Sequence, residues 1–234
     1  MVGNKKAIQE MKIKAALEAL KFVKDGMVLG IGSGSTVREF IKLLGNSDID
    51  TQKIISIPSS LDTENMLIEN GMVVGSFNQH PIIDLTVDGA DRVDEDLNVI
   101  KGGGGALLRE KIIAAAAKVV VIIVDESKLV SELGGSFPIP VEVIPYAMKF
   151  VARKLQAISG EPKLRMASDK LGPTVTDNGN IILDTDFQTI SNPLVFEGIL
   201  NNIPGVMENG LFPNNLVSKV IIASEKKIIV KEKN

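Results

Sequence analysis

The sequence predicts an α/β protein with a doubly wound, mostly parallel, Rossmann-like sheet and a smaller ferredoxin-like α+β lobe. Two observations predict this fold. Apolar strand-like runs alternate with helical segments up to about residue 132, which is typical of a parallel sheet wound with helices. After the glycines at 134 and 135 the order becomes β-α-β-β-α-β. The expected domains are residues 1–132 plus 208–234 for the α/β domain and 133–207 for the lobe.

The α/β domain is expected to open with an amphipathic helix, because apolar residues from Ile8 to Val23 recur at helical spacing. A run of β-branched residues at 119–124 suits a central parallel strand. The remaining elements alternate along the chain. Strands are expected at 27–31, 53–57, 73–74, 82–87 and 119–124, and helices at 37–44, 62–70 and 106–118.

The lobe is expected to contain a hairpin at Asp177-Asn178-Gly179-Asn180, because Asn-Gly tolerates the positive φ angles of a type I′ turn. Around it we expect strands at 141–144, near 164, near 175, at 181–183 and from 206, with helices at about 146–158 and 193–201. The tail is expected to add strands at 216–223 and 228–230 to the first domain.

Composition excludes several kinds of chemistry. The 234 residues include no cysteine and only one histidine, so disulfides, thiolate nucleophiles and histidine-rich metal sites are excluded. The net charge of −3 favours neither a nucleic-acid nor a membrane partner. The charged N-terminus is unlike a secretory signal, and no apolar run has the length of a membrane span, so a cytoplasmic protein is expected.

The loop Gly32-Ser33-Gly34-Ser35-Thr36 lies between a predicted strand and a predicted helix. Small residues let backbone N–H groups approach an anion, and the helix N-terminus and the hydroxyls add further donors. A phosphate group is the natural ligand of such a loop. The alternative, equally open at this point, is a tight turn in which Ser35 caps the helix.

The segment Asp88-Gly89-Ala90-Asp91 ends an apolar strand, so two carboxylates lie where ligands of open parallel sheets bind. Taken alone, the segment is better explained by capping and solvated turn acids. A divalent metal is a further alternative, since the acidic run 94–96 follows closely. That run lacks the alternation of a calcium loop, so no metal is expected.

Glycines 102–105 follow Lys101 and precede a helix that carries Glu110. Such glycines let the backbone close around a ligand, and the lysine adds a cation. An isolated Glu110 would be explained by the helix dipole. Together with the other two loops, however, these groups suit proton abstraction next to a carbonyl, with a cation and N–H groups holding the enediolate. The residues by themselves indicate a small phosphorylated carbonyl compound as substrate.

The segments GIGSGST, DLTVDGADRVD, KGGGGALLREK, VDESKLV and FPIPVEVIP, in this order and spacing, resemble ribose-5-phosphate isomerase type A. The resemblance implies interconversion of D-ribose 5-phosphate and D-ribulose 5-phosphate through a cis-enediolate, in the non-oxidative pentose phosphate pathway. It also implies no cofactor and a homodimer or homotetramer. The chain departs from many relatives at Ser33, where threonine is common, and at Gly105, where alanine is common.

The resemblance further implies roles for individual residues. Glu110 is expected to carry the proton between C2 and C1. Asp88 or Asp91 is expected to help open the sugar ring, and Lys101 to contact the oxygens where negative charge develops. The expected substrate-binding residues are Ser33, Gly34, Ser35, Thr36, Asp88, Gly89, Ala90, Asp91, Lys101, Gly102, Gly103, Gly104 and Lys128. Lys12 of the first helix is a further candidate for contact with the phosphate.

Two other functional classes fit parts of the pattern. A CoA transferase or another sugar-phosphate isomerase could share the sheet, but a CoA transferase would use its glutamate as a nucleophile. A sugar-phosphate-sensing domain of a regulator would need the phosphate loop but not Lys101, Glu110 and the acid pair together. Covalent labelling by acyl-CoA would indicate a CoA transferase. Its absence, together with isomerisation of ribose 5-phosphate, would indicate the isomerase. The sequence has no helix-turn-helix appendage to favour the second.

Overall fold

The computed structural model describes residues 2–135, 137–169 and 171–233, without the side chains of residues 2–4. The chain forms two compact units: a first unit of residues 1–90, 109–128 and 215–234, and a second unit of residues 91–108 and 129–214. The predicted boundaries assigned residues 91–108, 129–132 and 208–214 to the first domain, but these three segments lie in the second unit. Residues 91–108 belong there because β4 (Arg92–Val93) and β5 (Val99–Ile100) form a three-stranded sheet with β11 (Leu211–Phe212).

The first unit contains a six-stranded sheet in the order β13-β12-β6-β3-β1-β2, in which only the β12–β13 pair is antiparallel. The winding of the chain reverses between β1 and β3, and ligands of open α/β sheets bind beyond the carboxyl ends of the strands at such a point. The strands are β1 (Val28–Ile31), β2 (Ile55–Pro58), β3 (Ile83–Asp88), β6 (Ala117–Asp125), β12 (Lys219–Ala223) and β13 (Ile228–Glu232).

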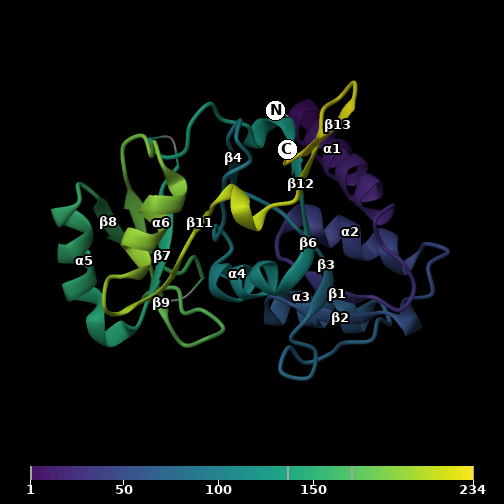
Figure 1. The fold of residues 1–234 in the computed structure, drawn as a ribbon, viewed down its shortest axis with the longest axis horizontal. Coiled ribbons are helices and arrows are strands. Elements are labelled where there is room, and N and C mark those ends of the chain that lie inside the picture. The colour runs from purple at the N-terminus through teal and green to yellow at the C-terminus, as the bar shows by residue number, and fades with distance from the viewer. Residues whose placement is uncertain (1, 136, 170, 234) are drawn as a thin grey trace. The chain divides into compact units, whose positions relative to one another are not determined.

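Helices of the first unit cover the sheet (Figure 1). Alanines of α1 and the aromatic ring of Phe40 in α2 share one buried cluster with Leu29 and Ile31 of β1. Ile113 of α4 belongs to a separate cluster, and Gly30 gives it room, because a Cβ at Gly30 would lie 2.5 Å from the Ile113 side chain. The helices are α1 (Val2–Leu20), α2 (Ser35–Gly45), α3 (Leu61–Glu69) and α4 (Leu107–Ala116), with short 3-10 turns η1 (Thr51–Lys53), η2 (Glu126–Lys128) and η4 (Asn214–Leu216).

The second unit contains a four-stranded antiparallel sheet in the order β10-β7-β9-β8. Ile139, Val141 and Val143 of β7 enter a cluster with residues of the two helices, whereas Pro140 and Glu142 alternate with them on the opposite face. The elements are β7 (Ile139–Val143), η3 (Pro145–Ala147), α5 (Met148–Ala157), β8 (Glu161–Leu164), β9 (Ile181–Asp186), α6 (Pro193–Asn201) and β10 (Val206–Asn209). This order confirms the predicted ferredoxin-like lobe.

Local predictions failed at three places. The helix predicted at 106–118 ends at Ala116, because Ala117 pairs with Ile83 and the Lys118 ammonium lies 2.7 Å from the Asp84 carboxylate of the neighbouring strand β3. The strands expected near 74 and 175 form only isolated bridges. The 177–180 turn is not of type I′, because Gly179 but not Asn178 has a positive φ. Among the described helices, none is long and apolar enough to cross a membrane.

Candidate active site

Asp88 lies at the reversal point of the first unit's sheet, at the carboxyl end of β3. Its side chain is buried, and Oδ1 accepts the N–H groups of Ser33 (3.2 Å) and Gly89 (2.7 Å). A Cβ on Gly32 would lie 1.8 Å from Asp88 Oδ1 and 1.9 Å from its Cγ. Gly32 therefore provides the space in which the carboxylate lies against the end of β1.

The predicted phosphate loop joins β1 to α2, which begins at Ser35. Gly34 is the N-cap, with φ +104°, and no side chain caps the helix, so the alternative in which Ser35 caps it is excluded. The first N–H groups of any helix have no partner within it, and here they stay available for an anion. The Lys12 ammonium of α1 donates to Ser35 Oγ at 2.9 Å, which brings a cation to this loop.

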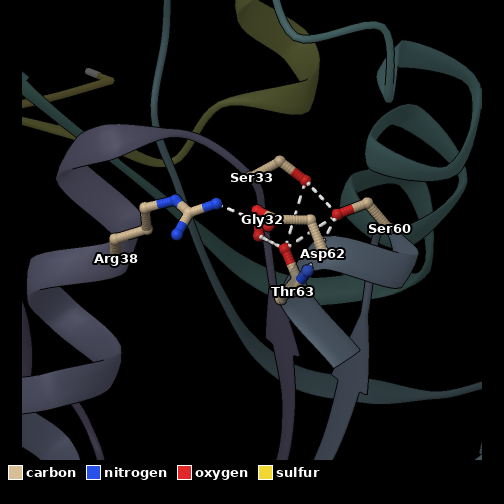
Figure 2. A network of polar contacts seen from close by, with 6 residues as sticks. All are labelled: Gly32, Ser33, Arg38, Ser60, Asp62 and Thr63. Atoms are coloured by element: carbon tan, nitrogen blue, oxygen red, sulfur yellow. Dashed lines mark hydrogen bonds and ion pairs between the residues drawn. The ribbon is translucent and has the colours of Figure 1, made fainter. Parts of the chain in front are cut away.

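A buried network of hydroxyl groups holds Ser33 and the end of β1 (Figure 2). Ser33 Oγ lies 2.8 Å from Ser59 Oγ and donates to Ser60 Oγ at 2.9 Å, and Thr63 Oγ1 donates to the Gly32 carbonyl at 2.8 Å. Ser33 was expected to donate its hydroxyl to phosphate, but both its hydroxyl and its N–H are engaged within the protein. The sequence analysis missed Ser59, Ser60 and Thr63, although a Ser-Ser pair at the carboxyl end of a predicted strand is a usable signal.

Glu110 and Lys128 complete the predicted residues of the first unit. Glu110 lies in the first turn of α4 and is only 4% exposed. Lys128 is half-buried at the end of η2, directly after β6. The turn that carries it is held by Asp125, whose Oδ1 accepts both the N–H and the hydroxyl of Ser127. A buried carboxylate on a helix and a lysine on a braced turn thus accompany Asp88 and the α2 N-terminus in this unit.

Asp91, Lys101 and glycines 102–104 lie in the second unit. Asp91 Oδ2 accepts the Gly103 N–H at 2.7 Å. Lys101 is 3% exposed, its N–H donates to the Gly210 carbonyl at 2.8 Å, and its ammonium lies 5.6 Å from the centroid of the Phe212 ring. The structure therefore divides the predicted site residues between its two units, and it shows how each set is held within its own unit.

Three glycines of the loop are required by the backbone or by a close contact, and the fourth, Gly104, is not. Gly102 and Gly105 have φ of +99° and +82°, where other residues are strained. A Cβ on Gly103 would lie 2.7 Å from Asp91 Oδ1, so this glycine allows the close approach of the carboxylate. Gly104 has neither constraint, since its Cβ would have no neighbour within 4 Å and its φ is not positive. Protein packing alone does not explain a glycine at position 104.

Glu95 and Asp96 are exposed residues of a turn, as is typical of solvated acids, but Asp94 of the same acidic run is buried. Asp94 is 8% exposed, and it accepts the backbone N–H and the side-chain amide of Asn98, each at 2.8 Å. Burial raises the pKa of Asp94, against the opposing effect of these hydrogen bonds. Within the residues that the structure describes, no group of three or more acidic or histidine side chains has the arrangement of a metal site.

Comparisons with known proteins decide the family. A family model described as ribose 5-phosphate isomerase A, or phosphoriboisomerase A, matches residues 55–227. The chain belongs to the ribose 5-phosphate isomerase A family. It is 46% identical to ribose-5-phosphate isomerase A of Pyrococcus abyssi over 94% of this chain and 96% of the relative. It is 44% identical to the Methanococcus aeolicus enzyme over 99% of this chain and 100% of the relative.

Solved structures of this family have the same fold. The structure from Methanocaldococcus jannaschii matches with a TM-score of 0.90 and 41% identity, covering 96% of this chain and 99% of the other. A D-ribose-5-phosphate isomerase in complex with phospho-erythronic acid matches with a TM-score of 0.93 and 44% identity, again over 96% and 99% of the two chains. The resemblance noted in the sequence motifs is thereby confirmed for the chain as a whole.

Proposed function

We propose that this chain interconverts D-ribose 5-phosphate and D-ribulose 5-phosphate by moving one proton between C2 and C1, with Glu110 as the base. The isomerase activity follows from membership of the family, which covers most of the chain. The observation that carries the mechanism is the buried carboxylate of Glu110 in the first turn of α4, placed directly after the glycine loop in the chain.

Phosphate binding is assigned to the N-terminus of α2. The N–H groups of Ser35 and Thr36 suit a phosphate dianion, because the N-cap residue Gly34 has no side chain that could occupy them. Lys12, already in contact with Ser35, and Lys128 would supply the positive charge. Because the hydroxyl of Ser33 is engaged in the buried network, we assign this residue to shaping the loop instead of donating to the phosphate.

The aspartates and the lysine are assigned to the oxygen atoms of the sugar. Asp88, held rigidly by two N–H groups, would exchange a proton with the ring or anomeric oxygen as the furanose opens. Lys101 would stabilise the negative charge that develops on the enediolate, together with N–H groups of the glycine loop, whereas Asp91 would bind a sugar hydroxyl. Gly89 and Ala90 keep the link between the two aspartates small.

The chemical step then balances without a cofactor. Glu110 takes the C2 proton of the open-chain aldose, and the electrons of that bond form the C1–C2 double bond of a cis-enediolate. A proton passes from O2 to O1. Protonated Glu110 then returns its proton to C1, which leaves a ketone at C2 and restores the carboxylate. Contacts with the distant phosphate hold the reacting carbons against the base.

Replacing Glu110 with glutamine tests the base assignment. The amide keeps the size of the side chain but cannot accept the proton, so we expect kcat to fall by at least roughly 100-fold with little change in KM. A coupled assay of ribulose 5-phosphate formation measures this change. Glu126→Gln is the matched control, because Glu126 is an exposed acid on η2. Turnover near the wild-type value in Glu110→Gln would refute the role of Glu110.

A further inference from the structure

Arg165 directly follows β8 in the second unit and contacts the glycine loop. Its Nη1 donates to the carbonyl of Gly102 at 2.8 Å and to that of Gly103 at 3.2 Å. The other edge of the guanidinium group binds Asp184 of β9, with Nε donating to Oδ2 at 2.8 Å and Nη2 to Oδ1 at 2.5 Å. One planar group thus joins the sheet of the second unit to two successive peptide units of the loop.

The planarity of the peptide bond turns these carbonyl contacts into an orientation of N–H groups. In a trans peptide the C=O and the following N–H point in opposite directions, and no cis peptide occurs in the described part of the chain. With the carbonyls of Gly102 and Gly103 directed at Arg165, the N–H groups of Gly103 and Gly104 are directed away from it. The structure bears this out at Gly103, whose N–H donates to the Asp91 carboxylate at 2.7 Å.

The Asp91 contact shows which kind of atom this side of the loop binds. A carboxylate oxygen is an anionic acceptor, as an enediolate oxygen is, and here it lies on a loop N–H. The hydrogen bonds from a cation to the two carbonyls also polarise those peptide units and strengthen their N–H groups as donors. Both effects suit a loop in which the Gly103 N–H holds Asp91 and the next N–H, that of Gly104, stabilises developing negative charge.

The Arg165–Asp184 pair is built to stay in place. The two side chains are only 17% and 24% exposed, and the carboxylate is bound through both of its oxygens. Such a two-point contact fixes the plane of the guanidinium group, which the single ammonium of a lysine could not do. Four glycines in succession have many accessible conformations. A hydrogen bond from the Gly105 N–H to the Gly102 carbonyl at 3.0 Å closes a turn within the loop, and the Arg165 contacts add a rigid support from outside it.

We propose that Arg165, fixed by Asp184, is a positioning residue that keeps the Gly103 N–H on the Asp91 carboxylate and orients the Gly104 N–H toward the enediolate oxygens. The proposal rests on the isomerase function described above. It adds a support for the glycine loop from a residue that lies far from the motifs in the sequence. Arg165 itself acts through the loop and makes no contact with the substrate.

Arg165→Lys and Asp184→Asn test this role, with Lys163→Met as the matched control. Lys163 pairs with Asp186 at 2.8 Å across the same two strands, but the pair is exposed. Because removing one oxyanion donor typically costs 100- to 1,000-fold, we expect a partial misorientation to lower kcat by about 10- to 100-fold with KM changed little. The Lys163→Met control should keep the wild-type kcat.

Inhibition provides a readout that a merely structural role would not move. Phospho-erythronic acid carries a carboxylate that can occupy the place of the enediolate oxygens, whereas inorganic phosphate can report only on the phosphate site. We expect Arg165→Lys to weaken inhibition by phospho-erythronic acid at least tenfold and to leave inhibition by inorganic phosphate unchanged. The proposal would be overturned if inhibition by both compounds weakened equally, or if inhibition by neither compound weakened. A wild-type kcat in both Arg165→Lys and Asp184→Asn would also overturn it.

The wild-type protein and the Glu110→Gln variant separate failure of this proposal from failure of the proposed function. An inactive wild-type protein would refute the isomerase assignment, whereas an active one with unaffected Arg165 variants would refute only the positioning role. Should Arg165→Lys not fold, as judged by its circular dichroism and melting temperature, Asp184→Asn decides the question. That variant keeps the arginine and weakens only its anchor.

Discussion

Replacing Gly32 with alanine should disable the enzyme through a single methyl group. The new Cβ would lie 1.8 Å from Asp88 Oδ1 and 2.6 Å from its Cβ. The carboxyl group would have to move by about 1.5 Å to reach van der Waals distance. Asp88 is 2% exposed, so it cannot turn into solvent without displacing its neighbours. Its hydrogen bonds from Ser33 and Gly89 would be lost or distorted.

The size of the effect follows from these contacts. Overpacking a buried site costs about 1–3 kcal/mol, and weakening hydrogen bonds to a charged group adds roughly 1–2 kcal/mol. We therefore expect the free energy of unfolding to fall by about 3 kcal/mol, which lowers the melting temperature by about 6–12 °C in a chain of this length. A misplacement of about 1 Å at a catalytic carboxylate should lower kcat/KM by about 100-fold.

Thermal unfolding and the coupled isomerase assay measure the two effects of Gly32→Ala. The double variant Gly32→Ala/Asp88→Gly is the decisive comparison, because it removes the side chain with which the methyl collides. Its melting temperature should equal that of Asp88→Gly alone, although both stay inactive. A Gly32→Ala protein with wild-type melting temperature and kcat/KM would refute the placement of Asp88 against β1.

Two further predictions concern the glycine loop and the ion pair between Asp84 of β3 and Lys118 of β6. Gly104→Ala should fold with unchanged or slightly higher stability, since its methyl group meets nothing within 4 Å. Its kcat/KM should fall, because we assign the Gly104 N–H to the enediolate and the methyl would crowd a substrate bound there. Wild-type kinetics in Gly104→Ala would show that no substrate atom comes close to it. The hydrogen bond from Lys118, followed by that from the Val28 N–H, lowers the pKa of Asp84. Asp84 therefore stabilises the folded state above the ordinary carboxyl pKa and loses this contribution as the pH falls through its lowered value. Asp84→Asn should then lower the free energy of unfolding at pH 7 by up to about 1 kcal/mol, and this loss should become smaller in acid. Urea titrations at pH 7 and at acidic pH would measure both values. A loss that does not depend on pH would contradict the ion pair.

The order of helices and strands was largely predictable, because period and turn residues are local properties of the chain. The helix at 193–201 was predicted with its observed bounds, since Asn192 and Pro193 mark its start. The predicted domain boundary failed at residues 91–108. Two very short strands there pair with each other, and one of them, β5, also pairs with β11 more than a hundred positions later. No local pattern in the sequence indicates that second contact.

The candidate site rests on motifs that are visible in the sequence, and the roles of its residues stay predictions. Asp88 ends a strand, Lys101 precedes the glycines, and Glu110 lies in the first turn of the helix that follows them. The serine network around Ser33 and the support from Arg165 were not predicted. Ser59, Ser60 and Arg165 look like ordinary polar residues in the sequence, and only the pairing of β1 with β2 and the path of the loop give them partners.

The two loops that we assign to ligand binding have one physical feature in common: each presents backbone N–H groups in fixed orientations. At the N-terminus of α2, the N-cap residue is a glycine, so no side chain competes with an anion for the first N–H groups. The hydroxyl of Ser33, which precedes it, is hydrogen-bonded to the buried Ser60 hydroxyl. At the glycine loop, Arg165 holds the carbonyls, so that the N–H groups face the other way. A protein with a net charge of −3 has no general field to attract a phosphate dianion. Its affinity for an anion must therefore come from local donors, and such donors are effective only while residues outside the ligand loops keep them from rotating.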